Sequence, residues 1–358
     1  MNKTLVISSI GLVTERDDLD PLLIDHGLRK KDIKRLTLGE KRLLTSCLRT
    51  LKKGNLANKE NSTARGGIIA GSNWGNVGSG FSEEEEALFN HNFMEASPMS
   101  LLKFVSSMPT NRCSITFGLN SVSVTFSGGE TSGLQAVIEA ARLLKTINNV
   151  DFILAGSFEV LTESRLKLQR ILNTNGLKSI LFRILVFSRL LLKKEQVFKY
   201  LWKFQGKDPA LLGGAGTVLI EPLDKALQRG LERMNILGVI KRYSQFSIHH
   251  KIDAGLLQEQ LSKMLNDNED GSAVDAVISL HHPGKKNRGL EKKILKKTGF
   301  KGKFFCGETM VGENFSVSDI AAVAFAASLF NFTNMRRILI NSFGQYSYTG
   351  LLIEKYHE

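Results

Sequence analysis

Cysteine, proline and tryptophan are scarce in this chain of 358 residues, which has three, six and two of them, respectively. Cys47, Cys113 and Cys306 are too few and too widely spaced for a disulfide framework or a zinc-binding pattern. We therefore expect no metal site and a reducing compartment, the cytoplasm. The first residues, MNKTLVISSIGLV, lack the length and cleavage site of a signal peptide and are typical of a first strand.

Acidic residues are fewer than basic ones. The 48 Lys and Arg against 35 Asp and Glu give a net charge of +13 and a pI of about 9.6. A basic surface favours acidic partners, which include nucleic acids, anionic membranes and acidic proteins. The lysines are spread along the chain and no nucleic-acid-binding motif accompanies them, so we do not expect nucleic acid as a partner.

Short apolar runs alternate with amphipathic patterns, which predicts an α/β protein with buried, mostly mixed sheets. Helices are expected over Thr131–Leu144, Leu256–Leu265, Leu290–Lys297 and Ser316–Leu329. Strands are expected over Thr4–Ser9, Gly67–Gly71, Ser121–Phe126, Asp151–Ala155, Thr217–Glu221, Ala273–Leu280, Lys303–Cys306, Arg337–Asn341 and Gly350–Glu354.

The segment Lys178–Gln205 is both strongly apolar and basic. Arginines interrupt its apolar run before it reaches the roughly 18 residues that a membrane-spanning helix needs. Two interpretations remain. The segment forms amphipathic helices packed on the core or a partner, which we favour because apolar stripes usually indicate packing. Alternatively, it contacts a membrane surface or a carrier protein peripherally.

The segment Gly118–Leu144 has the pattern of a strand, a glycine turn and a helix beginning at about Thr131. A side chain on such a turn lies at the positive end of a helix, where enzymes place a nucleophile whose pKa must be lowered. The residue at the turn is Glu130, and a carboxylate accepts acyl groups poorly. Taken alone, this segment favours the simpler interpretation that Glu130 caps the helix.

In this strand, glycine turn and helix start, the chain resembles the ketosynthase branch of the thiolase superfamily. The resemblance implies a layered α-β-α-β-α fold with two similar mixed-sheet halves, at residues 1–160 and 211–358, separated by an apolar basic insertion at 161–210. Glu130 occupies the position of the catalytic cysteine and is followed by Thr-Ser-Gly, as in the family. The other matching segments are Phe152–Glu159, Leu211–Gly230, Val274–His282, Thr309–Glu313 and Asn341–Gly344.

The resemblance also implies which catalytic groups are missing. His281 matches the first catalytic histidine, but Glu313 stands at the second histidine and Glu308 at the supporting lysine. Claisen condensation needs a thiolate to carry the acyl chain and donors to stabilise the oxyanion. Glu130, Glu308 and Glu313 supply neither, and three carboxylates in one pocket would repel one another and raise at least one pKa. We therefore expect that this chain lacks a complete set of catalytic residues.

A subunit with this defect exists in the family: the chain length factor of type II polyketide synthases, which pairs with a catalytic ketosynthase. By this resemblance the chain binds no cofactor itself and acts on phosphopantetheine-tethered substrates that an acidic acyl carrier protein delivers. The subunits would pair along the strand that contains Val122, Val124 and Phe126. Candidate residues that close the tunnel and set product length are Phe81, Phe89, Phe93 and Phe104.

Two alternatives stay open at the sequence level. The chain could decarboxylate malonyl-acyl carrier protein with His281, although the missing histidine and lysine argue against this. It could also be a binding module that holds an acyl chain or attaches a complex to a membrane through residues 178–205. The partner-subunit interpretation accounts for more of the residues than either alternative.

Overall fold

The computed structural model describes residues 3–14, 16–57, 65–73, 105–160, 213–248, 252–266, 273–281, 286–311 and 316–357. The described residues belong to one compact unit, Met1–Val160 together with Gly213–Glu358. The division of the sequence at residues 160 and 210 stays a prediction. Several sequence predictions lie outside the described residues, namely those for Phe81, Phe89, Phe93, Phe104, Glu313 and Lys178–Gln205.

The described strands form one sheet with the order β3-β2-β4-β5-β1-β6-β10-β9-β7-β8. Read outward from the β1–β6 junction, the first half has the order β1-β5-β4-β2-β3 and the second β6-β10-β9-β7-β8, so the second half repeats the first with each number raised by five and the sheet consists of two similar halves. Antiparallel pairing of β1 with β6 joins the halves, with Val6 opposite Val239. The strands are β1 (Leu5–Thr14), β2 (Gly66–Gly71), β3 (Ser123–Phe126), β4 (Phe152–Glu159), β5 (Gly214–Pro222), β6 (Gly238–Ser247), β7 (Ala276–His281), β8 (Lys303–Cys306), β9 (Arg337–Phe343) and β10 (Ser347–Glu354).

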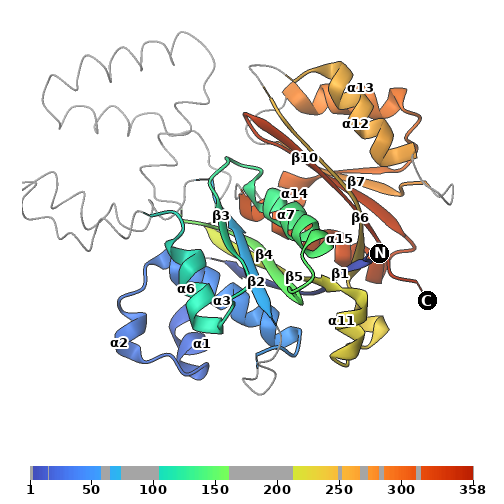
Figure 1. Ribbon diagram of the computed structural model, residues 1–358. Helices are drawn as coiled ribbons and strands as arrows, with labels where there is room; N and C mark the ends of the chain where they lie inside the picture. The colour runs from blue at the N-terminus through green and yellow to red at the C-terminus, as the bar shows by residue number, and fades with distance from the viewer. Residues whose placement is uncertain are drawn as a thin grey trace, which may run out of the picture. The chain divides into compact units, whose positions relative to one another are not determined.

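Helices lie between and outside the two half-sheets (Figure 1). The central helices α7 and α15 pack on each other and on strands of both halves, whereas α3 and α6 cover the outer face of the first half and α12 and α13 that of the second. This arrangement confirms the expected α-β-α-β-α layering. The helices are α1 (Leu19–Asp25), α2 (Lys30–Ile33), α3 (Leu38–Lys53), α6 (Met108–Phe117), α7 (Ser132–Thr146), α11 (Leu223–Gln228), the 3-10 helix η4 (Arg233–Asn235), α12 (Ala254–Asn266), α13 (Lys286–Lys297), α14 (Gly307–Val311) and α15 (Ser316–Phe332).

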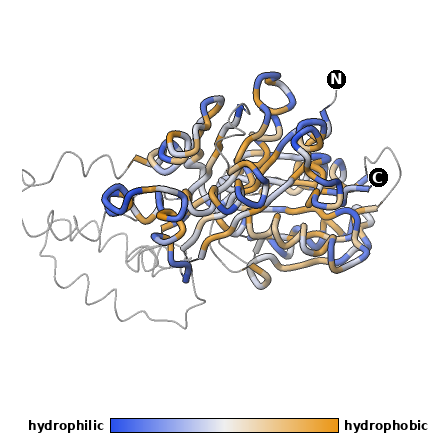
Figure 2. The backbone as a smooth tube through the Cα atoms, turned by 90° about the horizontal axis from the view of Figure 1, so that it is seen from below, coloured by the Kyte–Doolittle hydropathy of each residue, from blue (hydrophilic) through white to orange (hydrophobic). Residues whose placement is uncertain are grey.

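The largest apolar cluster lies in the central layer, where α7 and α15 bury residues such as Leu134, Val137, Ile320 and Val323 against both half-sheets. Separate clusters fill the outer layers under α3 and under α12 with α13. Figure 2 shows the hydrophobic residues concentrated along the strands and the hydrophilic ones on the surrounding loops and outer helices. Among the described helices, none has the length and apolar character needed to cross a bilayer.

A close backbone approach fixes how the two central helices cross. A Cβ atom on Gly133 of α7 would lie only 2.1 Å from the carbonyl oxygen of Ser316, the first residue of α15. Only glycine permits this distance, because real Cβ atoms do not approach other heavy atoms so closely. The N-termini of α7 and α15 are thereby held together next to the β3–α7 turn.

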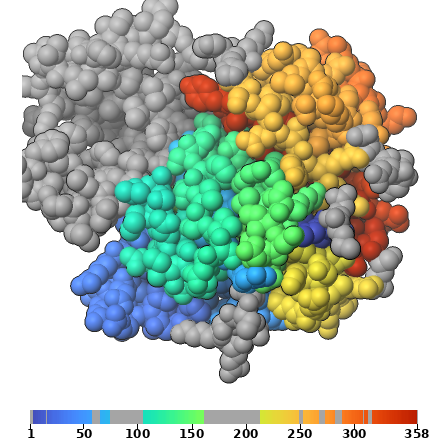
Figure 3. Space-filling view, viewed as in Figure 1, coloured from blue at the N-terminus to red at the C-terminus, as the bar shows by residue number. Residues whose placement is uncertain are grey.

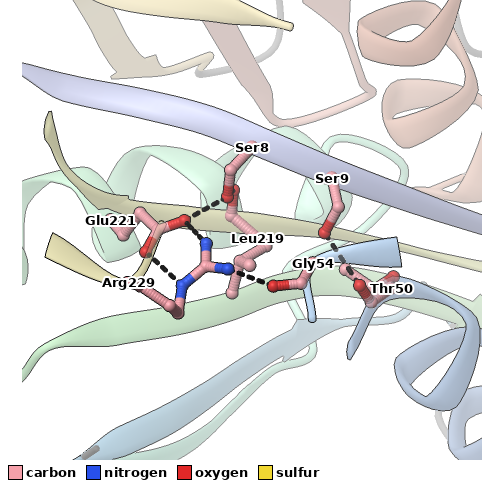
Figure 4. Close-up of polar contacts among 7 residues, drawn as sticks. All are labelled: Ser8, Ser9, Thr50, Gly54, Leu219, Glu221 and Arg229. Atoms are coloured by element: carbon pink, nitrogen blue, oxygen red, sulfur yellow. Dashed lines mark hydrogen bonds and ion pairs between the residues drawn. The ribbon is translucent and has the colours of Figure 1, made fainter. Parts of the chain in front are cut away.

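A buried ion pair ties the first half together (Figure 4). The Arg229 Nη2 atom lies 2.5 Å from Glu221 Oε1, and the side chains are only 13% and 3% exposed. Arg229 also donates from Nη1 to the carbonyl of Gly54, and Ser8 donates from its hydroxyl to Glu221. The cluster therefore connects β1, β5, the residue after α11 and the end of α3 through one carboxylate.

Candidate functional site

The β3–α7 connection has the expected geometry of a strand, a tight turn and a helix. Gly129 adopts a φ of +94°, a conformation that favours glycine. The Gly128 N–H donates to Ser132 Oγ (3.0 Å), and the Ser132 hydroxyl donates to the carbonyl of Gly129 (2.6 Å). Helix α7 begins at Ser132, one residue after the predicted start. Glu130 consequently stands between the turn and the positive end of α7.

The Glu130 side chain is enclosed by the loop that follows β9. The residue is only 8% exposed, and its Oε2 accepts a hydrogen bond from the N–H of Gln345 at 3.3 Å. A Cβ on Gly344 would lie 3.0 Å from the same oxygen, so the loop passes directly over the carboxylate. A hydrogen bond of 2.5 Å between the hydroxyls of Thr131 and Ser347 closes the loop beside it.

Burial raises the pKa of Glu130, and hydrogen bonds from its own backbone and from Gln345 oppose the shift. The sequence predicted that repulsion among three carboxylates would raise a pKa, whereas burial is the main cause of the raised pKa of Glu130. Glu308 lies in α14, but its side chain is not among those described, and neither is any part of Glu313. The grouping of Glu130, Glu308 and Glu313 in one pocket stays a prediction.

The N-terminus of α7 is capped from another helix. Asp319 of α15 is fully buried and its Oδ2 accepts the N–H of Leu134 at 2.9 Å. The N-cap residue of α7, Thr131, makes no capping bond with its own side chain. The interpretation of Glu130 as the cap is therefore wrong, because the N-cap is Thr131 and the Glu130 carboxylate accepts from the β9–β10 loop.

Sequence reasoning missed one buried acid near the candidate site, Asp319. Burial raises its pKa to about 7, the hydrogen bond from the Leu134 N–H opposes the shift, and the charge of Glu130 adds to it. The signal in the sequence was a single charged residue inside the apolar pattern of Ser316–Phe332. Two carboxyl groups, Glu130 and Asp319, thus meet at one helix terminus with raised pKa values.

His281 lies at the end of β7 and is held by a buried acid. Its Nε2 lies 2.8 Å from Glu291 Oε2 and 2.9 Å from Ser279 Oγ. Its ring stacks on Phe343, with centroids 4.5 Å apart. Glu291 is fully buried on α13 and also accepts the Asn341 side-chain amide at 2.7 Å. The imidazole is therefore part of a hydrogen-bonded network in the outer layer of the second half.

The C-terminal end of β9 brings the two candidate residues into one neighbourhood. His281 stands opposite Phe343 in the parallel pairing of β7 with β9, and the next two residues, Gly344 and Gln345, contact Glu130. Glu130 and His281 therefore lie at neighbouring strand ends, with different partners. Among the described residues no cluster of His, Cys, Asp and Glu has the arrangement of a metal site.

Val124 and Phe126 lie on β3, and Val122 directly precedes it. Among the described strands, β3 pairs in parallel with β2 alone, at one end of the sheet, and the three side chains are half-buried against the central cluster. The Ile68 N–H donates to Val122 O and the Ser72 N–H to Phe126 O. Because successive residues of a parallel strand bond to opposite sides, the backbone groups of Ser123 and Thr125 point away from β2.

The sequence and the fold were compared with known proteins. Residues 6–169 match the family model of the beta-ketoacyl synthase N-terminal domain. Among curated protein sequences, no significant match was found.

Solved structures match over the full chain at low sequence identity. A chain from the complex of a type II polyketide synthase acyl carrier protein with its ketosynthase bound to the hexaketide has a TM-score of 0.74 and 18% identity, with 99% of this chain and all of that chain covered. A beta-ketoacyl synthase from Burkholderia phymatum has a TM-score of 0.72 and 15% identity over 99% of this chain and all of its own. The ishigamide ketosynthase/chain length factor has a TM-score of 0.71 and 11% identity over the whole of both chains.

These findings agree with the topology. Two half-sheets of the same strand order enclose two central helices, and the turn before the first central helix carries Glu130. Residues 6–169 thus match the beta-ketoacyl synthase N-terminal domain, and the described part of the chain has the thiolase-like fold of the solved ketosynthases.

Proposed function

We propose that this chain is the non-catalytic subunit of a type II synthase, a chain length factor that forms a heterodimer with a catalytic ketosynthase and shapes its polyketide tunnel. The observation that carries the proposal is Glu130. A buried carboxylate stands where the fold would present a thiolate, and the backbone of Gln345 donates to it. A carboxylate does not form the thioester on which condensation depends.

The surroundings of His281 support the same conclusion. Decarboxylation of a malonyl thioester needs an imidazole N–H or a comparable donor directed at the substrate oxygen. The Nε2 of His281 lies instead within hydrogen-bonding distance of Glu291 and Ser279. This arrangement disfavours the alternative of a malonyl-acyl carrier protein decarboxylase.

Strand β3 supports the proposed dimer. It lies at the end of the sheet formed by the described strands, none of which pairs with the outward-facing backbone groups at Ser123 and Thr125, and these groups could pair with a strand of a second subunit. Ile115 on the adjacent helix α6 is 76% exposed, which adds an apolar side chain beside the strand. A heterodimer with a ketosynthase of the same fold would bury both features.

The proposed substrates remain those of the partner complex: acyl chains tethered to phosphopantetheine on an acidic acyl carrier protein. Phe81, Phe89, Phe93 and Phe104 are proposed to close the tunnel, although they lie outside the described residues. Replacement of each by Ala is expected to lengthen the products of the complex for at least one position. Unchanged product lengths for all four variants would refute the tunnel assignment.

The test of the proposal is co-expression with the cysteine-containing ketosynthase encoded nearest to this chain, followed by size-exclusion chromatography with mass determination. We expect a one-to-one complex that elongates acyl chains, and an isolated chain without condensing activity. A chain that binds no ketosynthase, or one that alone releases carbon dioxide from malonyl-acyl carrier protein, would overturn the proposal in favour of an altered enzyme.

A further inference from the structure

The outer surface of the second half carries an unusual concentration of positive charge. Between residues 286 and 303 the sequence has eight Lys and Arg and one acid, Glu291. The acid is fully buried and faces His281, so it does not offset the surface charge. Six of the lysines are exposed on α13 and at the start of β8, and we call them the lysine ridge: Lys292, Lys293, Lys296, Lys297, Lys301 and Lys303.

Acidic side chains among the described residues do not neutralise the positive charge of the ridge. Within the part of the chain that the structure describes, no ion pair involves any of its six lysines. Lys292 and Lys296, like Lys293 and Lys297, are four residues apart on one helix, and each such like-charged pair destabilises a helix by about 0.2–0.5 kcal/mol. An anionic partner would relieve this repulsion.

Local packing holds the ridge in a fixed orientation. Ile294 and Leu295, on the opposite side of α13, are 3% exposed and pack in the cluster shared with α12. The Lys292 Nζ atom lies 4.7 Å from the centroid of the Phe304 ring on β8, close enough for a cation–π interaction. The ridge is thus a surface held in place on α13 and the residues leading into β8, within the orange area of Figure 3.

The chemistry of the ridge discriminates among acidic partners. Its exposed cations are all lysines, which bind carboxylates as point charges, whereas nucleic-acid surfaces add arginine forks and exposed aromatic rings for stacking. Phe300, Phe304 and Phe305 are only half-exposed and contribute to packing. The apolar side chains of α13 pack inward, with Ile294 and Leu295 buried and Leu290 partly buried in the same cluster, so α13 presents no exposed apolar face to a bilayer.

We propose that the lysine ridge is the docking surface for the acidic helix of an acyl carrier protein. This inference rests on the proposed function and names the surface that its carrier would use. Helix α13 also carries Glu291, which holds His281 beside the strand ends of the candidate site. A carrier docked on α13 is therefore attached to the same helix that borders the site.

The test compares two variants of the full chain with equal changes in net charge. The first replaces Lys292, Lys293, Lys296 and Lys297 with Glu. The matched control replaces four exposed lysines of the first half with Glu, namely Lys30, Lys31, Lys34 and Lys52. A third variant carries Gln at the four α13 positions and guards against effects of introduced acids. Binding is measured to a purified holo-acyl carrier protein, to single-stranded DNA and to phosphatidylglycerol vesicles.

We expect the α13 Glu variant to bind the carrier protein about tenfold or more weakly, the Gln variant to lose less affinity, and the control to change by less than about twofold. Equal losses in the variant and the control, or no loss in either, would overturn the proposal. So would a selective loss of DNA or vesicle binding with carrier binding unchanged. Size-exclusion chromatography with the ketosynthase separates the two proposals, because the ridge variants should still form the one-to-one complex.

Discussion

The ion pair between Arg229 and Glu221 permits a quantitative prediction. Arg229 donates to both oxygens of Glu221, at 2.5 and 3.4 Å, and to the carbonyl of Gly54. Replacement of Arg229 with Ala leaves the carboxylate buried with the Ser8 hydroxyl as its remaining side-chain donor. Breaking a buried pair from one side costs about 3–5 kcal/mol, because the remaining charge has lost its partner. We expect the free energy of unfolding to fall by about that amount.

The assay is urea unfolding of Arg229→Ala, Glu221→Gln, the double variant Arg229→Met/Glu221→Leu, and the control Arg229→Lys. The lysine control keeps the charge but not the fork of donors, and should cost about 1–2 kcal/mol. The double variant should lose less free energy of unfolding than the two single variants lose together, since neither charge remains buried. A loss below about 1 kcal/mol for Arg229→Ala, or additive single effects, would refute the reasoning that the pair is a buried, coupled unit.

Four further predictions follow from the central layer and the sheet edge. Asp319 has a pKa raised to about 7 from 3.8, so the native state retains a proton that the unfolded chain loses. Stability should therefore decline between about pH 4 and pH 7. Asp319→Asn should flatten this decline in pH-dependent thermal unfolding, and an unchanged slope would contradict the assignment. Glu130→Gln removes a buried charge whose pKa burial raises, so stability at pH 7 should rise by about 1 kcal/mol without loss of the ketosynthase complex; a decrease would show that the charged form is required. Gly133→Ala should destabilise by about 1–3 kcal/mol in urea unfolding, because its Cβ would lie 2.1 Å from Ser316 O; a neutral result would mean that α7 and α15 shift apart readily. Ser123→Pro should weaken the one-to-one complex on size exclusion while Ser123→Ala does not, since only proline removes an outward N–H from β3; equal elution of both variants as the complex would argue against strand pairing.

The apolar runs predicted most of the sheet because buried strands have a strong local signature. Lys303–Cys306 was predicted with its observed bounds, and the other eight predicted strands overlap observed ones. Strand β6 was missed, since the half beyond Ile240 is a mixture of exposed and half-buried, mostly polar residues without a strict alternation and is defined by its pairing with β10. Helix α3 was also missed, although Thr37 and Glu40 form a capping box that the spacing Thr-x-x-Glu indicates.

The sequence predicted those parts of the site whose geometry depends on residues adjacent in the chain. The turn at Gly129 and the helix start at Ser132 follow from local sequence. The partners of Glu130 and His281 do not, because they come from segments 215 and 10 residues away. Glu291 lies among lysines in a sequence typical of a solvent-exposed helix, so its burial is visible only when α13 is placed on β7. Tertiary packing therefore decided which carboxylates became part of the site.

The repeated strand order of the two halves has a consequence for assembly. The sheet ends in β3 on one side and in β8 on the other, and these strands occupy equivalent positions in their halves. Strand β3 carries only uncharged side chains, whereas β8 begins at Lys303 beside Lys301, and lysines on a terminal strand discourage the addition of another strand. Under the proposed pairing along β3, strand addition would therefore occur at one end alone, which would give a closed pair of subunits instead of an open filament.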